Sequence, residues 1–483
     1  MKSQSNIDYI KILIFLSFCI SLIVSKYNLN NYDRYSEKDG IALYHIMIKS
    51  DANRYLSHGA EIKKDLENGK NFFETGREHF TKYLPPRLAA AYYYFLDIDL
   101  FNNIEEKKIN LGIHFPYLIL QCLFYYMSLF FLYLVISKKI EKKICFPIVI
   151  FLALEPTIFQ YHGTFWSESF FFTLQIILLI LILRDNLNFY NFFLIGIFLS
   201  LLSLQKQVAF FYIFFIFFYY LLYLKKKEYY KLLFILFGFF LIQMLPGYNN
   251  FVRSGKFYLL TADTKTAVYY NTIRPIILKS NKVTQNKFDI AEGKITLEWL
   301  KKNSIKFDTS KINIGKSLSF NFNVYRKSIV NESDKVKYDK FIAERTIKIL
   351  LDNPWAFFKH ILNNSLHIVL LNPFHIYSDY HFIKSEFYYT TDTHDKLVPV
   401  RVIYSILIYA ISLVGFFNLI RVREYKLLII IILSMLYFYG MVSWHGNTRY
   451  FVPVLIYISF LFGYGCNNLL QFAKKKLIGD NII

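Results

Sequence analysis

The sequence predicts an all-α polytopic membrane protein with about ten transmembrane helices and two large extracytoplasmic segments. Hydrophobic residues make up 55% of its 483 residues, whereas charged residues make up only 19%. The hydrophobic residues form repeated long runs that a soluble chain could not bury. Short clusters of basic residues separate many of these runs. Together these observations favour a membrane protein over a disordered, collagen-like or disulfide-scaffold protein.

The net charge of +21 raises the question of nucleic-acid binding, which needs basic residues on a folded surface together with readable motifs. The sequence has no such motif, so we expect no nucleic acid as a partner. The four cysteines, Cys19, Cys122, Cys145 and Cys466, lie in or at the edge of apolar runs and show no Cys-x-x-Cys spacing. They predict neither a zinc site nor a disulfide framework.

Each predicted transmembrane helix is a run of mainly apolar residues near the length that a bilayer requires, which is about 20 residues. The first run has no small-x-small cleavage site at its end, so we interpret it as a retained signal anchor. The ten runs are 10–24, 115–136, 144–160, 165–183, 189–204, 208–224, 232–245, 398–420, 427–444 and 450–472.

Short basic loops favour the cytoplasm, and this rule gives the orientation. With the N-terminus inside, every short basic cluster falls on the cytoplasmic side, which predicts a plasma-membrane protein with both termini cytoplasmic. The clusters contain Lys138, Lys139, Lys142, Lys143, Arg184, Lys225, Lys226, Lys227, Arg421, Arg423, Lys426, Lys474, Lys475 and Lys476.

Two long segments, 26–114 and about 246–397, are then external. The apolar stretch 355–371 contains Lys359, His360 and His367, and counting it as a span would reverse the last basic clusters, so we expect an interfacial amphipathic helix there. The predicted organisation is an N-terminal membrane module (1–250), a large external segment (251–397) and a C-terminal three-helix membrane module (398–483).

The first external segment contains a predicted helix that opens at Asp51. Ser50 precedes it as a candidate helix cap, and Tyr55, Gly59 and Ile62 recur at helical spacing. The simplest interpretation of Asp51 is a first-turn acid that satisfies free backbone donors.

The pattern Asp51-x-x-x-Tyr55-x-x-x-Gly59-Ala60, followed by Tyr83-Leu-Pro-Pro-Arg87, resembles the GT-C superfamily of polyprenyl-phosphate-sugar glycosyltransferases. The likeness is nearest to its bacterial Rgt-type and aminoarabinose-transferase-like branch, which is related to the protein O-mannosyltransferases. The resemblance implies a GT-C-like architecture. It also implies that Asp51 is catalytic, since an acidic residue of the first external loop has that role in the family.

The expected chemistry suits these residue types. A carboxylate near an acceptor hydroxyl can remove its proton as the oxygen attacks the sugar. Cations stabilise the departing lipid phosphate, and the planar fork of arginine binds two of its oxygens. Four residues near these motifs are candidates for binding the donor phosphate or the rest of the substrate, namely Arg54, Tyr55, Arg87 and Arg449.

A second acidic motif lies between the third and fourth predicted helices. Glu168 opens the fourth helix, as a carboxylate does in the family, and the resemblance implies that it is a second catalytic residue, although a plain helix N-terminal acid is the alternative. Tyr161 and Trp166 suit the aromatic belt at the membrane interface. Glu155 lies in an apolar run, where an ionisable group is a candidate site residue, or near the surface, where it would pair with a cation.

Two further motifs complete the resemblance. Lys206 stands in an external turn where relatives often carry Arg-Pro, and it is either a donor-phosphate cation or a snorkelling lysine. Arg449 belongs to an Arg-Tyr-x-x-Pro sequence before the last helix, and it is a donor-phosphate or a structural cation. His445 is a candidate there too, but more simply a polar loop residue.

No Asp-x-Asp pair accompanies Asp51, so we predict no metal site, and a role for a divalent cation stays open. The lysine-rich stretch 281–340 matches no known motif, and we interpret it as an insertion that recognises the acceptor. The expected partners are therefore the lipid bilayer, a polyprenyl-phosphate-linked sugar donor and a glycan, lipid or protein acceptor of the envelope.

The function expected from these features is an inverting glycosyltransferase that acts on the extracytoplasmic face. The alternative is a transporter or flippase of a lipid-linked or anionic solute. Transporters usually place ionisable residues near the midplane and are built from repeats, whereas here the acidic candidates lie at one surface. A third interpretation, a non-catalytic assembly partner, would not need the carboxylate of Asp51.

Overall fold

The structure is a computed structural model. It describes residues 8–31, 50–75, 83–98, 111–184, 188–255, 257, 259, 273–280, 284–312, 322–371, 398–443 and 451–479. Within these ranges the regular structure is helical, and the β pairing consists of one isolated antiparallel bridge between Phe307 and Ile329. The all-α prediction is confirmed for the described residues.

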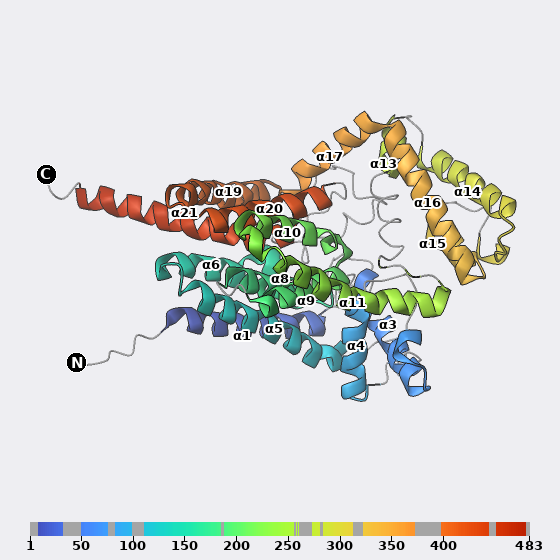
Figure 1. Ribbon diagram of the computed structural model, residues 1–483, viewed down its shortest axis with the longest axis horizontal. Coiled ribbons are helices and arrows are strands. Elements are labelled where there is room, and N and C mark those ends of the chain that lie inside the picture. The colour runs from blue at the N-terminus through green and yellow to red at the C-terminus, as the bar shows by residue number, and fades with distance from the viewer. Residues whose placement is uncertain are drawn as a thin grey trace.

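All ten predicted runs fall on helices, which pack as a bundle around one large apolar core (Figure 1). Five helices are long and apolar enough to cross a membrane: Tyr9–Asn31, Gly112–Ile136, Lys226–Val252, Pro399–Arg421 and Val452–Lys475. These helices support a membrane-embedded protein. The bundle consists of α1 (Tyr9–Asn31), α5 (Phe115–Ile136), α6 (Lys142–Leu154), α7 (Pro156–Phe159), α8 (Glu168–Leu183), α9 (Phe189–Gln205), α10 (Tyr212–Tyr223), α11 (Lys231–Ser254), α19 (Val398–Arg421), α20 (Tyr425–Val442) and α21 (Val452–Gly479).

Helices α1 and α21 each continue seven residues past the predicted end, to Asn31 and Gly479. Two further predicted boundaries are wrong, and both involve proline. The run 144–160 is broken between α6 and α7, because Pro156 has no N–H to donate and disfavours helical geometry at Glu155, the residue before it. The run 232–245 was expected to end at Pro246, but α11 continues through this residue to Ser254 and ends at Gly255, which has a φ of 67°.

Contacts outside the bundle explain why α11 continues. The side chain of Asn249 donates a hydrogen bond to the carbonyl oxygen of Phe73, and the ring of Tyr248 meets that of Phe73 edge-on at 4.9 Å. Phe73 belongs to the short helix η1 (Phe72–Glu74) of the first external segment. The end of α11 thus packs on η1, outside the apolar core of the bundle.

The ends of the bundle differ in what they carry. In Figure 1 the start of α1 and the end of α21 lie at one end. The opposite end carries α3 (Ser50–Glu67), α4 (Leu84–Phe95), α13 (Arg274–Ser280), α14 (Gln285–Lys302), α15 (Phe322–Ser328) and α16 (Glu332–Asp352). The two predicted external segments are therefore on the same side of the bundle, opposite its terminal helix ends.

The external helices α13 to α16 have a core of their own, separate from that of the bundle. Its buried members include Phe288, Leu300, Tyr338 and Ile342. The predicted amphipathic helix at 355–371 is present as α17 (Pro354–Ile368). The chain after α17 is tied to α19, because the backbone N–H of Leu371 donates to the hydroxyl of Ser405 over 2.9 Å.

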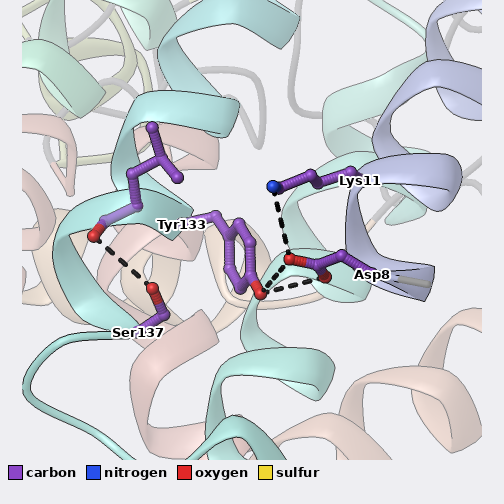
Figure 2. A network of polar contacts seen from close by, with 5 residues as sticks. Asp8, Lys11, Tyr133 and Ser137 are labelled. Carbon is purple, nitrogen blue, oxygen red and sulfur yellow. Dashed lines mark hydrogen bonds and ion pairs between the residues drawn. The ribbon is translucent and has the colours of Figure 1, made fainter. Parts of the chain in front are cut away.

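Polar side chains join α1 to α5 at the end of the bundle that carries the terminal helix ends. The Tyr133 hydroxyl lies 2.8 and 3.0 Å from the two carboxylate oxygens of Asp8, which also lies 3.7 Å from the ammonium of Lys11 (Figure 2). Tyr133 lies in the last turn of α5, so this contact fixes the register of the two helices at that end.

Helices α19 and α21 approach closely because glycines face each other across their contact. A Cβ atom on Gly415 would overlap the carbonyl oxygen of Leu461, and one on Gly465 would overlap that of Ile411. Small residues at such positions let two membrane helices pack backbone to backbone.

We predict that Gly415→Ala destabilises the protein by about 1–3 kcal/mol, because the added methyl group forces α19 away from α21. The measurement is thermal unfolding of purified protein in detergent. Gly440→Ala in α20 is the matched control, since nothing lies within 4 Å of a Cβ there. Equal unfolding temperatures for the two variants would contradict the close-packing explanation.

Candidate functional site

Asp51 lies in the first turn of α3, as predicted. The helix begins at Ser50, and its inner face carries the buried side chains of Tyr55 and Ile62. The Asp51 carboxylate is 22% exposed, and its Oδ1 lies 4.0 Å from an Nη of Arg54, whose side chain is 45% exposed. The carboxylate is thus at the surface of α3, with a cation one turn away.

Helix α4 packs tightly on α3 and holds Arg87. A Cβ on Gly59 would lie 2.7 Å from the Cβ of Ala89, so this glycine is required for the close approach. The guanidinium carbon of Arg87 lies 3.5 Å from the ring centroid of Tyr83, and Nη1 donates to the Tyr83 carbonyl over 3.3 Å. Burial raises the pKa of the Tyr83 hydroxyl, although the Arg87 charge opposes this, so Tyr83 is neutral at physiological pH.

The segment from Glu155 to Glu168 is folded into the bundle. The side chain of Gln121 donates to the carbonyl oxygens of His162 and Thr164, each over 3.0 Å, and Asn28 of α1 donates to that of Gly163 over 3.1 Å. These contacts give the backbone of the segment partners inside the protein.

The aromatic residues of the segment are buried as a result. Tyr161 is 1% and Trp166 is 6% exposed, and their rings stack at 6.0 Å. The prediction that they form an interfacial belt is therefore wrong, because the segment turns inward. The ring of His162 lies 4.0 Å from that of Tyr125, and its Nδ1 is 2.8 Å from the hydroxyl of Ser169. Burial lowers the pKa of His162 to about 3, so its imidazole is neutral.

Glu155 is buried at the junction of α6 and α7. One carboxylate oxygen accepts from the backbone N–H of Ile158 over 2.8 Å, and the other accepts from the hydroxyl of Tyr404 in α19 over 2.7 Å. In the described part of the chain its partners are neutral donors, and the interpretation as a surface acid paired with a cation is wrong. Glu155 joins the loop after α6 to α19.

Glu168 and Lys206 form a buried ion pair. The Lys206 Nζ lies 2.7 Å from an oxygen of Glu168, with the two side chains 2% and 0% exposed. Gln205, the last residue of α9, donates to the Ser167 carbonyl over 3.0 Å and fixes the two segments beside the pair. The snorkelling interpretation of Lys206 is wrong, since its ammonium points into the protein.

The candidate residues thus fall into two groups near one end of the bundle. Asp51 and Arg54 lie on α3, with Arg87 on the adjoining α4, whereas Glu168 and Lys206 lie together where α8 begins and α9 ends. Helix α4 contacts α9. His445 and Arg449 fall outside the described residues, so their predicted roles stay predictions.

Sequence reasoning missed three residues that hold this region together, namely Gln121, Gln205 and Tyr404. A usable signal exists for the first two, because a polar amide in or beside an apolar run is costly and needs a partner. Tyr404 gives no such signal among the 40 tyrosines of the chain. In the described ranges no group of three or more His, Cys, Asp or Glu residues is placed to hold a metal ion.

A comparison with protein-family models and with curated proteins found no match for this chain.

The buried pair leads to a stability prediction. We expect Lys206→Gln to destabilise the protein by about 3–5 kcal/mol, because it removes the ammonium that lies 2.7 Å from the buried Glu168 carboxylate. The double variant Glu168→Gln/Lys206→Gln removes both charges and is expected to recover most of this loss. The measurement is thermal unfolding of the two variants and of Glu168→Gln alone.

A double variant whose loss equals the sum of the two single losses would contradict the pairing. The surface pair of Lys70 and Asp65, whose atoms lie 2.6 Å apart, is the matched control. Neutralising Lys70 should change the stability by less than about 1 kcal/mol, since solvent screens exposed pairs.

Proposed function

We propose that this protein is a membrane glycosyltransferase that transfers a sugar from a polyprenyl-phosphate-linked donor to an envelope acceptor on the extracytoplasmic face. One observation carries the proposal. Asp51 lies on α3, at the end of the bundle that also carries the external helices, and the buried pair of Glu168 and Lys206 lies where α8 begins and α9 ends, with α9 in contact with α4. This is the arrangement expected for an enzyme whose lipid-linked substrate lies in the outer leaflet and whose acceptor lies outside.

The proposal includes a GT-C-like architecture in which the helices of all ten apolar runs span the membrane. Helices shorter than the five long ones, such as α8 with 16 residues, would extend about 24 Å, somewhat less than the hydrocarbon core. Arg184 follows the apolar stretch of α8, and Lys206 follows that of α9. Both termini would be cytoplasmic, as the basic short loops favour.

In the proposed reaction Asp51 is the general base. Its carboxylate accepts the proton of the acceptor hydroxyl while the acceptor oxygen bonds to the anomeric carbon and the bond from that carbon to the phosphate oxygen breaks. Polyprenyl phosphate leaves from the opposite face of the sugar, so the configuration inverts. The partial exposure of Asp51 supports this role, because the carboxylate can be reached by an acceptor.

The proposed phosphate-binding cations are Lys206 and Arg449. Glu168 would act by orienting the ammonium of Lys206, 2.7 Å away, toward the departing phosphate. Burial strengthens this contribution, since a charge in a low-dielectric site acts on its partner with little screening.

The test is transfer of radiolabelled sugar from a panel of polyprenyl-phosphate donors to envelope acceptors, with membranes that contain the wild type or Asp51→Asn. We expect the variant to lose at least about a hundredfold in transfer rate, because the amide keeps the shape of the side chain but cannot accept the proton. Asp65→Asn on the same helix is the matched control and should retain wild-type transfer.

Three outcomes would overturn the proposal or part of it. Wild-type protein that is folded but transfers from no donor would favour a transporter or an assembly partner. Full activity of Asp51→Asn would remove Asp51 from the reaction. Loss of folded protein in Asp51→Asn would identify the residue as a helix-capping acid.

A further inference from the structure

The external helices α13 to α16 place their charges unevenly between core and surface. Their described arginines lie in ion pairs within the unit: Arg274 Nη2 is 2.8 Å from Asp289, Arg326 Nε is 2.9 Å from Asp339, and Arg345 Nε is 2.8 Å from Glu292. The carboxylates of all three pairs are at most 7% exposed. Three of the carboxylates of this unit are therefore buried and neutralised by arginines.

The surface of the same unit is left strongly basic. Among residues 273–352 whose side chains the structure describes, only three acidic residues are exposed, namely Glu298, Glu344 and Asp352. Nine lysines are exposed: Lys287, Lys294, Lys301, Lys302, Lys306, Lys327, Lys337, Lys340 and Lys348.

Three of these lysines form a line along α14. Lys287, Lys294 and Lys301 follow at intervals of seven residues, which places them on one face of a helix. Glu298, which is also exposed, lies on the same face one turn from Lys294 and Lys301, so the line has a net charge of +2. The opposite face is buried against the unit, with Asp289, Thr296 and Leu300 among its residues. The lysine line is therefore a straight cationic ridge about 21 Å long, from 1.5 Å of rise per residue.

Helix stability accounts for only part of this ridge, because Glu298 is spaced to pair with Lys294 (i, i+4) and Lys301 (i, i+3). Positive charge is favourable near a helix C-terminus, which explains Lys301, but it is unfavourable near the N-terminus, where Lys287 is the third residue of α14. A ridge of this kind is typical of a surface that binds a polyanion.

The position of α14 favours a polymer over the membrane surface as the partner. Figure 1 shows α14 at the end of the molecule farthest from the helical bundle. Charge interactions fade within about 8 Å at physiological salt, so we expect the charges of lipid headgroups around the bundle to be largely screened at α14.

We propose that the α14 ridge binds a linear polyanion, a polymer that carries phosphate or carboxylate groups at regular intervals. Such a chain can lie along the ridge and meet its lysines in succession. The polymer could also be the acceptor of the sugar, and only this second role rests on the proposed glycosyltransferase function. Binding itself requires no catalysis.

The test measures binding of fluorescently labelled inorganic polyphosphate to the full-length protein in nanodiscs of zwitterionic lipid. We expect binding that weakens as salt rises, and a loss of about tenfold in affinity for the combined variant Lys287→Gln/Lys294→Gln/Lys301→Gln. The matched control is Lys225→Gln/Lys226→Gln/Lys227→Gln, which removes three exposed lysines from the loop between α10 and α11 and should bind as the wild type does.

Polygalacturonate as a second probe separates carboxylate from phosphate preference, and neutral dextran should not bind. Absence of polyanion binding to the wild type, or an equal loss in both variants, would overturn the proposal. Loss of polyphosphate binding in nanodiscs that contain anionic lipid would assign the ridge to headgroups and would also overturn it.

The result is separable from the catalytic proposal. Asp51→Asn should bind polyphosphate as tightly as the wild type, since Asp51 lies on α3 and not on the ridge. If the wild type proves to be a glycosyltransferase, the α14 variant should raise the KM for a polyanionic acceptor and leave kcat unchanged. An unchanged KM would remove the acceptor role while leaving sugar transfer intact.

Discussion

A polar side chain inside this bundle needs a partner from the protein itself, because lipid offers no hydrogen bonds. The fully buried hydroxyl of Tyr212 lies 2.8 Å from that of Tyr457, which joins α10 to α21. Gln175 of α8 donates to the carbonyl oxygen of Pro453 over 2.9 Å. Each such contact joins two helices that the apolar side chains alone would leave free to slide.

The same requirement shapes the candidate site. The loop between α7 and α8 carries backbone groups that water cannot reach, and Gln121 and Asn28 provide their partners. The ion pair of Glu168 and Lys206 extends the principle to charges, since each would be costly to bury alone. The loop is thereby held in one conformation before any substrate binds, and a site of this kind needs little reorganisation during a reaction.

The sequence predicted the helices of the bundle far better than their ends or their contacts. Long apolar runs indicate a helix directly, whereas the break at Pro156 and the continuation of α11 through Pro246 depend on what the neighbouring segments provide. Glu168 and Lys206 were each selected as candidates, but their pairing was not predicted. They are 38 residues apart, and only the packing of α8 on α9 brings them together.

The long α11 has a mechanical consequence. It begins within the bundle at Lys231, and its far part contacts both η1 of the first external segment and α16 of the second. The two segments, which are separated by seven bundle helices in the chain, thus rest on a common support. A tilt of this one helix would displace η1 and α16 together, so a movement of α11 would reach both external segments.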